Sequence, residues 1–310
     1  MSHSTASLTP LNVVAVLASP PPQPDFVLPG LPLGSVGLLV GRGGVGKTFF
    51  GMSLGSAIAL GLQPLNGLFD SAPEGRTVFL CAEESPELLA GRLHHLVGGL
   101  SEDAAFPLAA PSRRERVIQA LSARFSLFPM AGKDARLLIE RRATHLCELL
   151  TVYAKGARLL IVDPLRRLHD GDEIDPSAMT QLVQLFERIA QQAGCAVLVM
   201  HHINKSSSQN GLASTVDAVR GSTALVDGVR WVANLEVMGE KDAARFGVEE
   251  EQRRDYLRFD VTKSNYAAPQ PTRWLKRGSG GVLGLAEDLN SQEPAQSSSG
   301  RRSRRARRDY

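Results

Sequence analysis

Short apolar runs alternate with longer segments of helical character along most of the chain. Four runs are nearly free of polar residues: SVGLLV (35–40), TVFLCA (77–82), RLLIVD (158–163) and CAVLVM (195–200). Such continuous runs are typical of strands in a parallel sheet that helices cover on both faces. The segments between them predict helices near 47–60, 85–100, 134–155 and 177–193.

The pattern changes after residue 228, where apolar and polar positions indicate several strands with few helices between them. The predicted strands are 229–237, 255–263, 272–277 and 281–286. Strands that follow one another closely pair most readily in antiparallel fashion. The sequence therefore predicts an α/β fold, with a mostly parallel sheet flanked by helices and antiparallel strands added at its C-terminal side.

Both ends of the chain differ from this pattern. Residues 11–18 are apolar, and the four prolines of 19–24 stop any helix, so residues 1–24 are interpreted as an N-terminal arm with a stiff linker, or simply as a disordered end. From residue 287 the chain is rich in Ser, Gln, Gly and Arg. We therefore expect one core over residues 25–286 and a disordered basic tail over 287–310.

The composition is that of a globular protein. Of the 310 residues, 43% are hydrophobic and 22% are charged, which excludes a fibrous or wholly disordered chain. No apolar run reaches the roughly 18 residues of a membrane span, and no secretory signal is recognisable. Three scattered cysteines, Cys81, Cys147 and Cys195, indicate buried thiols rather than a disulfide framework or a zinc site. Together these features favour a cytoplasmic protein without a membrane partner.

The net charge of +3 hides an asymmetry between the body and the tail. Residues 301–310 hold six arginines and Asp309 and so contribute +5, which leaves −2 for the other 300 residues. The alkaline pI therefore comes from the tail. The body offers no bulk electrostatic attraction for double-stranded DNA.

The strongest chemical signal is the sequence GRGGVGKT, which follows the first buried strand and opens a helix. It matches the phosphate-binding loop pattern, in which backbone N–H groups and a helix N-terminus surround phosphate oxygens. The expected nucleotide-binding residues are Gly41, Arg42, Gly43, Gly44, Val45, Gly46, Lys47 and Thr48. Lys47 should contact the β- and γ-phosphates, and the Thr48 hydroxyl should hold Mg²⁺. ATP and Mg²⁺ are therefore the expected ligands.

Carboxylates end two of the other buried strands. Asp163 ends RLLIVD at the edge where open α/β sheets bind ligands, and it fits the second Mg²⁺-holding position. Glu83 and Glu84 directly follow TVFLCA. Hydrolysis needs a general base, and Glu83 is the first candidate for it, with Glu84 as the alternative.

Further candidates lie late in the chain. His201 and His202 end the strand CAVLVM, where one of them could contact the γ-phosphate. The polar segment 204–219 that follows is long enough to be a functional loop. Arg220, Arg230 and Lys263 could serve the phosphates of the same molecule or of a neighbour.

The motifs GRGGVGKT, CAEE, LLIVDPLRRLH, LVMHHINK, RGSTALVDGVRW and VTKSNYAAP occur in this order over residues 25–285. As a set they resemble the RecA/DnaB-like P-loop ATPases, and most of all the RepA-type hexameric replicative helicases of mobilisable broad-host-range plasmids. The resemblance implies a RecA-like core in a six-membered ring, with ATP between subunits. It also implies translocation on single-stranded DNA in the 5′ to 3′ sense, with separate initiator and primase proteins as partners.

The resemblance also implies roles for individual residues. Glu83 corresponds to the catalytic base, and His202 to a γ-phosphate sensor. Arg230 corresponds to an arginine finger donated to the next subunit's ATP, and Lys263 to a second such finger. Arg92 corresponds to an arginine near the nucleotide. The basic tail has no counterpart that we would carry over from the family.

Three other classes of protein share some of these features. A ParA-like partition ATPase would have lysine where Arg42 stands. A RecA/KaiC-like recombinase or regulatory ATPase would bind DNA without unwinding it, and a nucleotide-gated scaffold would not depend on catalysis. Strand displacement on a forked substrate separates the helicase from all three.

Overall fold

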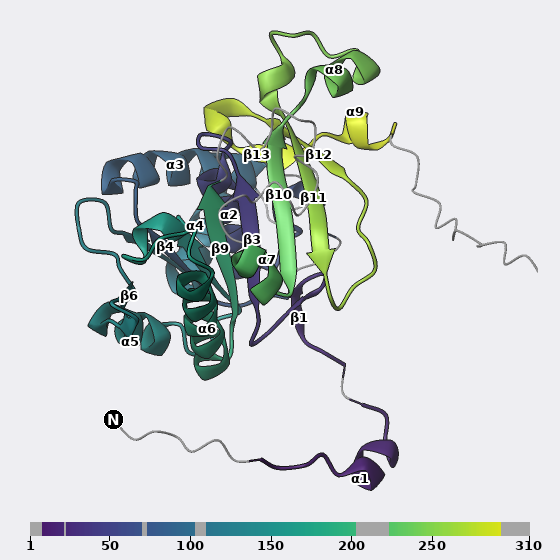
Figure 1. Ribbon diagram of the computed structural model, residues 1–310. Coiled ribbons are helices and arrows are strands. Elements are labelled where there is room, and N and C mark those ends of the chain that lie inside the picture. The colour runs from purple at the N-terminus through teal and green to yellow at the C-terminus, as the bar shows by residue number, and fades with distance from the viewer. Residues whose placement is uncertain (1–7, 22, 70–72, 103–109, 203–222, 293–310) are drawn as a thin grey trace, which may run out of the picture.

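The residues that the structure describes are built around a nine-stranded sheet (Figure 1). The structure is a computed structural model that describes residues 8–21, 23–69, 73–102, 110–202 and 223–292. The sheet order is β13-β12-β11-β10-β3-β9-β8-β4-β5. Its strands are β3 (Val36–Gly41), β4 (Thr77–Cys81), β5 (Phe125–Pro129), β8 (Leu159–Asp163), β9 (Ala196–His202), β10 (Trp231–Val237), β11 (Tyr256–Ser264), β12 (Arg273–Arg277) and β13 (Leu283–Leu285).

Helices and small hairpins connect and flank these strands. The helices are α1 (Val13–Leu17), α2 (Lys47–Leu60), α3 (Pro86–Glu102), α4 (Ala110–Arg124), α5 (His145–Tyr153), α6 (Pro176–Ala193), α7 (Thr223–Gly228), α8 (Glu240–Phe246) and α9 (Glu287–Asn290). Two hairpins pair β1 (Phe26–Leu28) with β2 (Leu31–Pro32) and β6 (Leu138–Ile139) with β7 (Arg142–Ala143). Short 3₁₀ turns are η1 (Pro64–Asn66), η2 (Leu165–Arg167), η5 (Arg253–Asp255) and η6 (Ser279–Gly281).

The strand directions confirm the predicted fold class. Strands β10, β3, β9, β8, β4 and β5 run parallel to one another, and β11, β12 and β13 extend the sheet beyond β10 in antiparallel fashion. In the parallel part, Cys81 lies beside Asp163, and Gly41 lies beside His202. The carboxyl ends of β3, β9, β8 and β4 therefore meet along one edge, where the predicted site residues follow.

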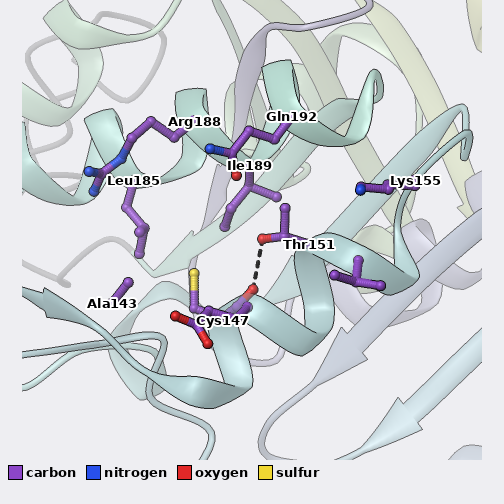
Figure 2. Close-up of a pocket in the computed structure, with 10 residues that line it drawn as sticks. Ala143, Cys147, Thr151, Lys155, Leu185, Arg188, Ile189 and Gln192 are labelled. Atoms are coloured by element: carbon purple, nitrogen blue, oxygen red, sulfur yellow. Dashed lines mark hydrogen bonds between the residues drawn. The ribbon is translucent and has the colours of Figure 1, made fainter. Parts of the chain in front are cut away.

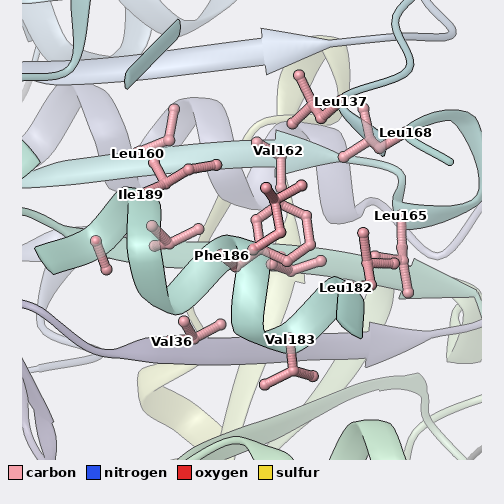
Figure 3. Packing of buried hydrophobic residues seen from close by; sticks show 14 of the residues in the cluster. Val36, Leu137, Leu160, Val162, Leu165, Leu168, Leu182, Val183, Phe186 and Ile189 are labelled. Atoms are coloured by element: carbon pink, nitrogen blue, oxygen red, sulfur yellow. The ribbon is translucent and has the colours of Figure 1, made fainter. Parts of the chain in front are cut away.

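Each central strand contributes side chains to two separate cores, because successive residues of a strand point to opposite faces. In β8, Leu160 and Val162 face the core under α5, α6 and α7, whereas Leu159 and Ile161 face the core under α2 and α3. Figure 3 shows Leu182, Phe186 and Ile189 of α6 packed on the first of these faces. The central part of the sheet is thus covered on both faces, which explains why β3, β4, β8 and β9 are apolar at nearly every position.

The structure corrects one predicted element. The sequence predicted a helix over 134–155, but helix α5 begins only at His145, after the β6–β7 hairpin. Glu140 and Arg141 form the tip of this hairpin with φ angles of 46° and 65°, a left-handed conformation that no α-helix contains. Thr144 then caps α5, because its hydroxyl accepts a hydrogen bond from the Cys147 amide at 3.3 Å.

The sequence pattern also missed several elements. Strand β5 is the edge strand beyond β4, and helix α4 directly precedes it in the chain. Helix α8 lies between β10 and β11 in the chain. Helix α9 lies within the segment predicted to be a disordered tail, and its Leu289 is buried, so the packed part of the chain extends past residue 286. The rest of that tail, from residue 293, lies outside the described residues.

The predicted N-terminal arm contains helix α1, none of whose residues is buried. None of the helices among the described residues has the length and apolar character that crossing a membrane would require. All three cysteines are buried with free thiols.

Candidate nucleotide site at the carboxyl edge of the sheet

The loop between β3 and α2 has the backbone of a phosphate cradle. Gly44 and Gly46 adopt φ angles of 76° and 104°, which a side chain would oppose, and Gly46 is the N-cap of α2 without any side-chain cap. Gly41 lies so close to Leu235 that an added Cβ would stand 2.5 Å from the Leu235 carbonyl oxygen. The uncapped N–H groups at the start of α2 are therefore free for an anion.

Lys47 is folded back onto its own loop. Its Nζ donates hydrogen bonds to the carbonyl oxygens of Gly41 at 2.8 Å and Arg42 at 3.0 Å, and the residue is 4% exposed. Burial lowers the pKa of Lys47 to about 8, although the charges of Asp163 and Glu83 oppose this shift. A phosphate in the cradle would offer the ammonium a better-matched, charged acceptor than the two carbonyls.

Thr48 and Asp163 supply the oxygen atoms expected of a magnesium site. The Thr48 hydroxyl donates a 2.6 Å hydrogen bond to Asp163 Oδ2, and Asp163 is 5% exposed. Burial raises the pKa of Asp163, while the Thr48 hydrogen bond and the Lys47 charge hold it down. A hydroxyl and a carboxylate side by side are hard oxygen ligands, so these residues fit Mg²⁺ beside a bound triphosphate.

The two glutamates after β4 have different surroundings. Glu84 forms an ion pair with Arg92 of α3, and the Arg92 guanidinium lies 5.1 Å from the centre of the Phe49 ring. Glu83 is more open, with Arg167 Nε at 3.7 Å from Oε1. Arg92 therefore holds Glu84 beside the cradle and leaves Glu83 as the freer carboxylate.

His202 lies between the lysine and the candidate base. Its Nδ1 is 3.1 Å from Lys47 Nζ, and its Nε2 is 3.8 Å from Glu83 Oε2. Burial lowers the pKa of His202, the Lys47 charge lowers it further, and Glu83 opposes both. Neutral at pH 7, the imidazole can accept from the ammonium at Nδ1 and donate at Nε2. Lys47, Glu83 and His202 thus form one connected set.

Arg230 and Lys263 are not brought to this edge within one chain. Trp231 pairs with Gly37 at the start of β3, so the exposed Arg230 lies at the amino end of the parallel strands, about 16 Å along the strand from Gly41. Lys263 Nζ donates to the carbonyl oxygens of Val226 at 2.8 Å and Asp227 at 3.1 Å. The predicted loop 204–219 and Arg220 lie outside the described residues.

Sequence reasoning missed two arginines that contact the site. Arg167 follows Asp163 in the motif LRRLH and reaches Glu83. Arg277, at the end of β12, donates a 2.6 Å hydrogen bond from Nη2 to the carbonyl oxygen of Val45 in the phosphate cradle. The only sequence signal for Arg277 is a basic residue at a strand end, which many exposed strands share.

A separate pocket of about 500 Å³ lies between α5 and α6 (Figure 2). Apolar atoms of Cys147, Leu185 and Ile189 line it, and the Thr151 hydroxyl that faces it is already bonded to the Cys147 carbonyl at 2.7 Å. None of its lining residues belongs to the phosphate cradle or follows the ends of β4, β8 or β9. This pocket is therefore separate from the candidate nucleotide site.

Comparison with known proteins agrees with this arrangement. Residues 2–208 match the family model AAA_25, described as an AAA domain. The chain belongs to this AAA domain family. The match includes the phosphate cradle, Glu83, Asp163 and His202, so the four parts of the site lie inside the AAA domain.

Solved structures show the same fold at low sequence identity. One solved ATPase domain superposes with a TM-score of 0.56 at 13% identity, over 82% of this chain and 85% of that one. A DnaB-like replicative helicase, solved in a study of its interactions with primase, superposes with a TM-score of 0.55 at 12% identity, over 86% of this chain. The matched part spans 63% of that helicase. This AAA domain therefore has a RecA-like P-loop fold.

Proposed function

We propose that this AAA domain is an ATP-dependent DNA helicase that forms a ring, translocates 5′ to 3′ on single-stranded DNA and unwinds duplex DNA during plasmid replication. The observation that carries the proposal is the convergence of Lys47, the Thr48–Asp163 pair, Glu83 and His202 on one strand edge. These residues correspond to separate requirements of ATP hydrolysis: phosphate binding, Mg²⁺ binding, a general base and a sensor of the γ-phosphate. The ordered set of motifs and the fold of the DnaB-like helicase support the finer assignment to DNA unwinding.

The residues divide the chemistry between them. Lys47 exchanges its two carbonyl acceptors for β- and γ-phosphate oxygens, and the N–H groups at the start of α2 hold the same phosphates. Thr48 and Asp163 would hold Mg²⁺, which neutralises charge on the phosphates when it is bound. Glu83 accepts a proton from the attacking water while the water oxygen forms a bond to the γ-phosphorus. The bond between that phosphorus and the ADP oxygen breaks, and ADP leaves.

Some of the proposed parts depend on a neighbouring subunit. Arg230 lies too far from its own phosphate cradle to serve it, so we assign it to the ATP of the next subunit, with Lys263 beside it. Head-to-tail contacts of this kind close into a ring when the rotation between subunits is right. We expect a hexamer that binds single-stranded DNA and works with separate initiator and primase proteins.

The test is strand displacement on a forked duplex, with ADP in place of ATP as the control. We expect displacement that requires ATP and a free 5′ single strand. Single-strand-stimulated hydrolysis without displacement would contradict the helicase and support the RecA/KaiC-like alternative. The mass of the assembly in solution provides a second test, because a ring predicts a multiple of the 33.4 kDa chain.

A further inference from the structure

The hairpin formed by β12, the turn η6 and β13 packs beside the phosphate cradle. Its turn is seated against two helices. A Cβ added at Gly281 would lie 3.1 Å from the Phe49 ring of α2, and one added at Gly280 would overlap the His95 ring of α3. The end of β12 therefore has a fixed place next to the start of α2.

Arg277, the last residue of β12, joins this hairpin to the cradle. Its Nη2 donates a 2.6 Å hydrogen bond to the carbonyl oxygen of Val45, and its Nε donates a 3.3 Å hydrogen bond to the carbonyl oxygen of Arg254 in η5. The side chain is half-buried. A guanidinium is a planar fork of fixed geometry, so one side chain bridges the cradle and the segment that precedes β11.

The guanidinium also occupies the space beside Gly46. A Cβ added at Gly46 would lie 2.9 Å from Arg277 Nη1, so a side chain at this position would displace the arginine. The backbone ladder of α2 begins at the Gly46 carbonyl, which accepts a 2.9 Å hydrogen bond from the Phe50 amide. Arg277 therefore holds the last carbonyl before the helix, that of Val45.

The orientation of that carbonyl determines where the next amide points. A trans peptide unit is planar, and its C=O and N–H groups point in opposite directions. The Val45 carbonyl faces Arg277, so the Gly46 N–H of the same peptide points away from the arginine and into the cradle. A cation on the carbonyl oxygen also polarises the peptide and makes its N–H a stronger donor to an anion.

We propose that Arg277 is a positioning residue for the nucleotide site: it holds the Val45–Gly46 peptide so that the Gly46 N–H points into the cradle before a phosphate arrives. The inference rests on the proposed function, because it assumes that this edge binds a nucleotide. A donor that is already in place needs no reorganisation when the ligand binds. Arg277 thus acts on the phosphates through the backbone and from outside the cradle.

This role predicts a particular kinetic signature. A backbone donor that holds the phosphates contributes equally to the bound substrate and to the transition state, so its loss weakens binding and leaves the chemical step unchanged. ATP and ADP should lose affinity by the same factor. A group that contacted the γ-phosphate directly would instead distinguish ATP from ADP.

The experiment combines amide hydrogen exchange of the nucleotide-free full chain with nucleotide binding and steady-state ATPase kinetics. In Arg277→Gln we expect the amides of residues 42–48 to exchange about tenfold faster, because the cradle opens more often. The Kd values for ATP and for ADP should both rise about tenfold, as for loss of a charged hydrogen-bond donor. The KM for ATP should rise with them, and kcat should stay within about twofold.

Lys276→Gln is the matched control, because it removes one positive charge from the neighbouring position of β12. Lys276 Nζ lies 4.9 Å from the centre of the Tyr256 ring, and successive residues of a strand point to opposite faces. Lys276→Gln should keep wild-type loop exchange and nucleotide affinity. Wild-type exchange and affinity in Arg277→Gln, equal effects of the two variants, or a loss of affinity for ATP alone would overturn the proposal.

A second variant covers loss of folding. Arg277→Lys keeps the charge, but a single ammonium cannot bridge the carbonyls of Val45 and Arg254, so it should show the same changes to a smaller extent. If Arg277→Gln does not fold, wild-type exchange and affinity in Arg277→Lys would refute the proposal. Hydrogen exchange is measured without nucleotide, so it tests this inference even if the wild-type chain fails to bind or hydrolyse ATP, an outcome that would refute the proposed function.

Discussion

At the scale of single residues, the two glutamates after β4 are distinguished by their partners. The sequence leaves Glu83 and Glu84 as alternatives, because both directly follow a strand that ends at the site. The contact of Glu84 with Arg92 depends on a helix that begins beyond Glu84. Glu83 is contacted by His202 from β9 and by Arg167 from the turn η2 after β8. Such long-range contacts cannot be read from local spacing, so the sequence alone could not show that the two glutamates have different surroundings.

We therefore expect Glu83→Gln to abolish hydrolysis and to leave ATP binding intact, because the amide keeps the shape but cannot take the proton from water. The loss should be at least about a hundredfold in kcat, as for other general bases. Glu84→Gln is the matched variant and should retain most of the turnover. Steady-state kinetics and fluorescent-nucleotide binding measure the two quantities, and the reverse ranking of the variants would assign the base to Glu84.

At the scale of elements, the sequence predicted the parts of the fold with the strongest periodicity. The fully buried strands β3, β4, β8 and β9 and the helices α2 and α6 are where the apolar pattern places them. Edge strand β5 was missed because each of its residues is only half-buried. The β6–β7 hairpin was missed because its turn residues, Glu140 and Arg141, have no glycine or asparagine to signal a left-handed backbone.

Strand β10 contains a carboxyl group whose burial should make stability depend on pH. Burial raises the pKa of Glu236 from 4.5 to about 7, and Oε1 has no hydrogen-bond partner among the described residues. The unfolded chain loses this proton at a lower pH than the folded chain does. Stability therefore falls as pH rises from about 4.5 to 7, and this contribution is constant above that window.

Glu236→Gln should remove this dependence. At pH 8 the variant should be more stable than the wild type by about 1–3 kcal/mol, and the difference should vanish near pH 4, where the wild-type group is neutral in both states. Urea unfolding at both pH values measures the effect, with the exposed Glu249→Gln as the control. A stability difference that is the same at both pH values would contradict the stated cause.

At the scale of the whole molecule, Arg230 and the phosphate cradle lie at opposite ends of the parallel strands. An arginine finger at one end of the strands and a nucleotide site at the other end are compatible with subunits that pack head to tail. The proposed hydrolysis therefore depends on assembly of the ring. An arginine placed beside the γ-phosphate accelerates phosphoryl transfer about 10³–10⁵-fold in other nucleotide hydrolases. The sequence suggested the finger through resemblance, and the register of β10 with β3 supplies a physical reason for action on a neighbour.

Mixing two inactive variants tests this arrangement. Lys47→Ala lacks the lysine and Arg230→Ala lacks the finger, but a mixed ring contains some interfaces with both groups intact. ATPase activity should therefore rise above that of either variant alone. If mixed rings are present by native mass spectrometry and activity does not recover at any ratio, Arg230 does not act on the neighbour's ATP.

The central claim is that the carboxyl edge of this sheet hydrolyses ATP, and the steady-state ATPase rate of Lys47→Ala tests it most directly. Lys47 is buried against the cradle and supplies the cation that the γ-phosphate needs, so its loss should remove stabilisation of several kcal/mol. We predict that the wild type hydrolyses ATP and that the folded variant retains less than about a tenth of its turnover. Turnover near the wild-type rate in Lys47→Ala would place the chemistry elsewhere and contradict the account.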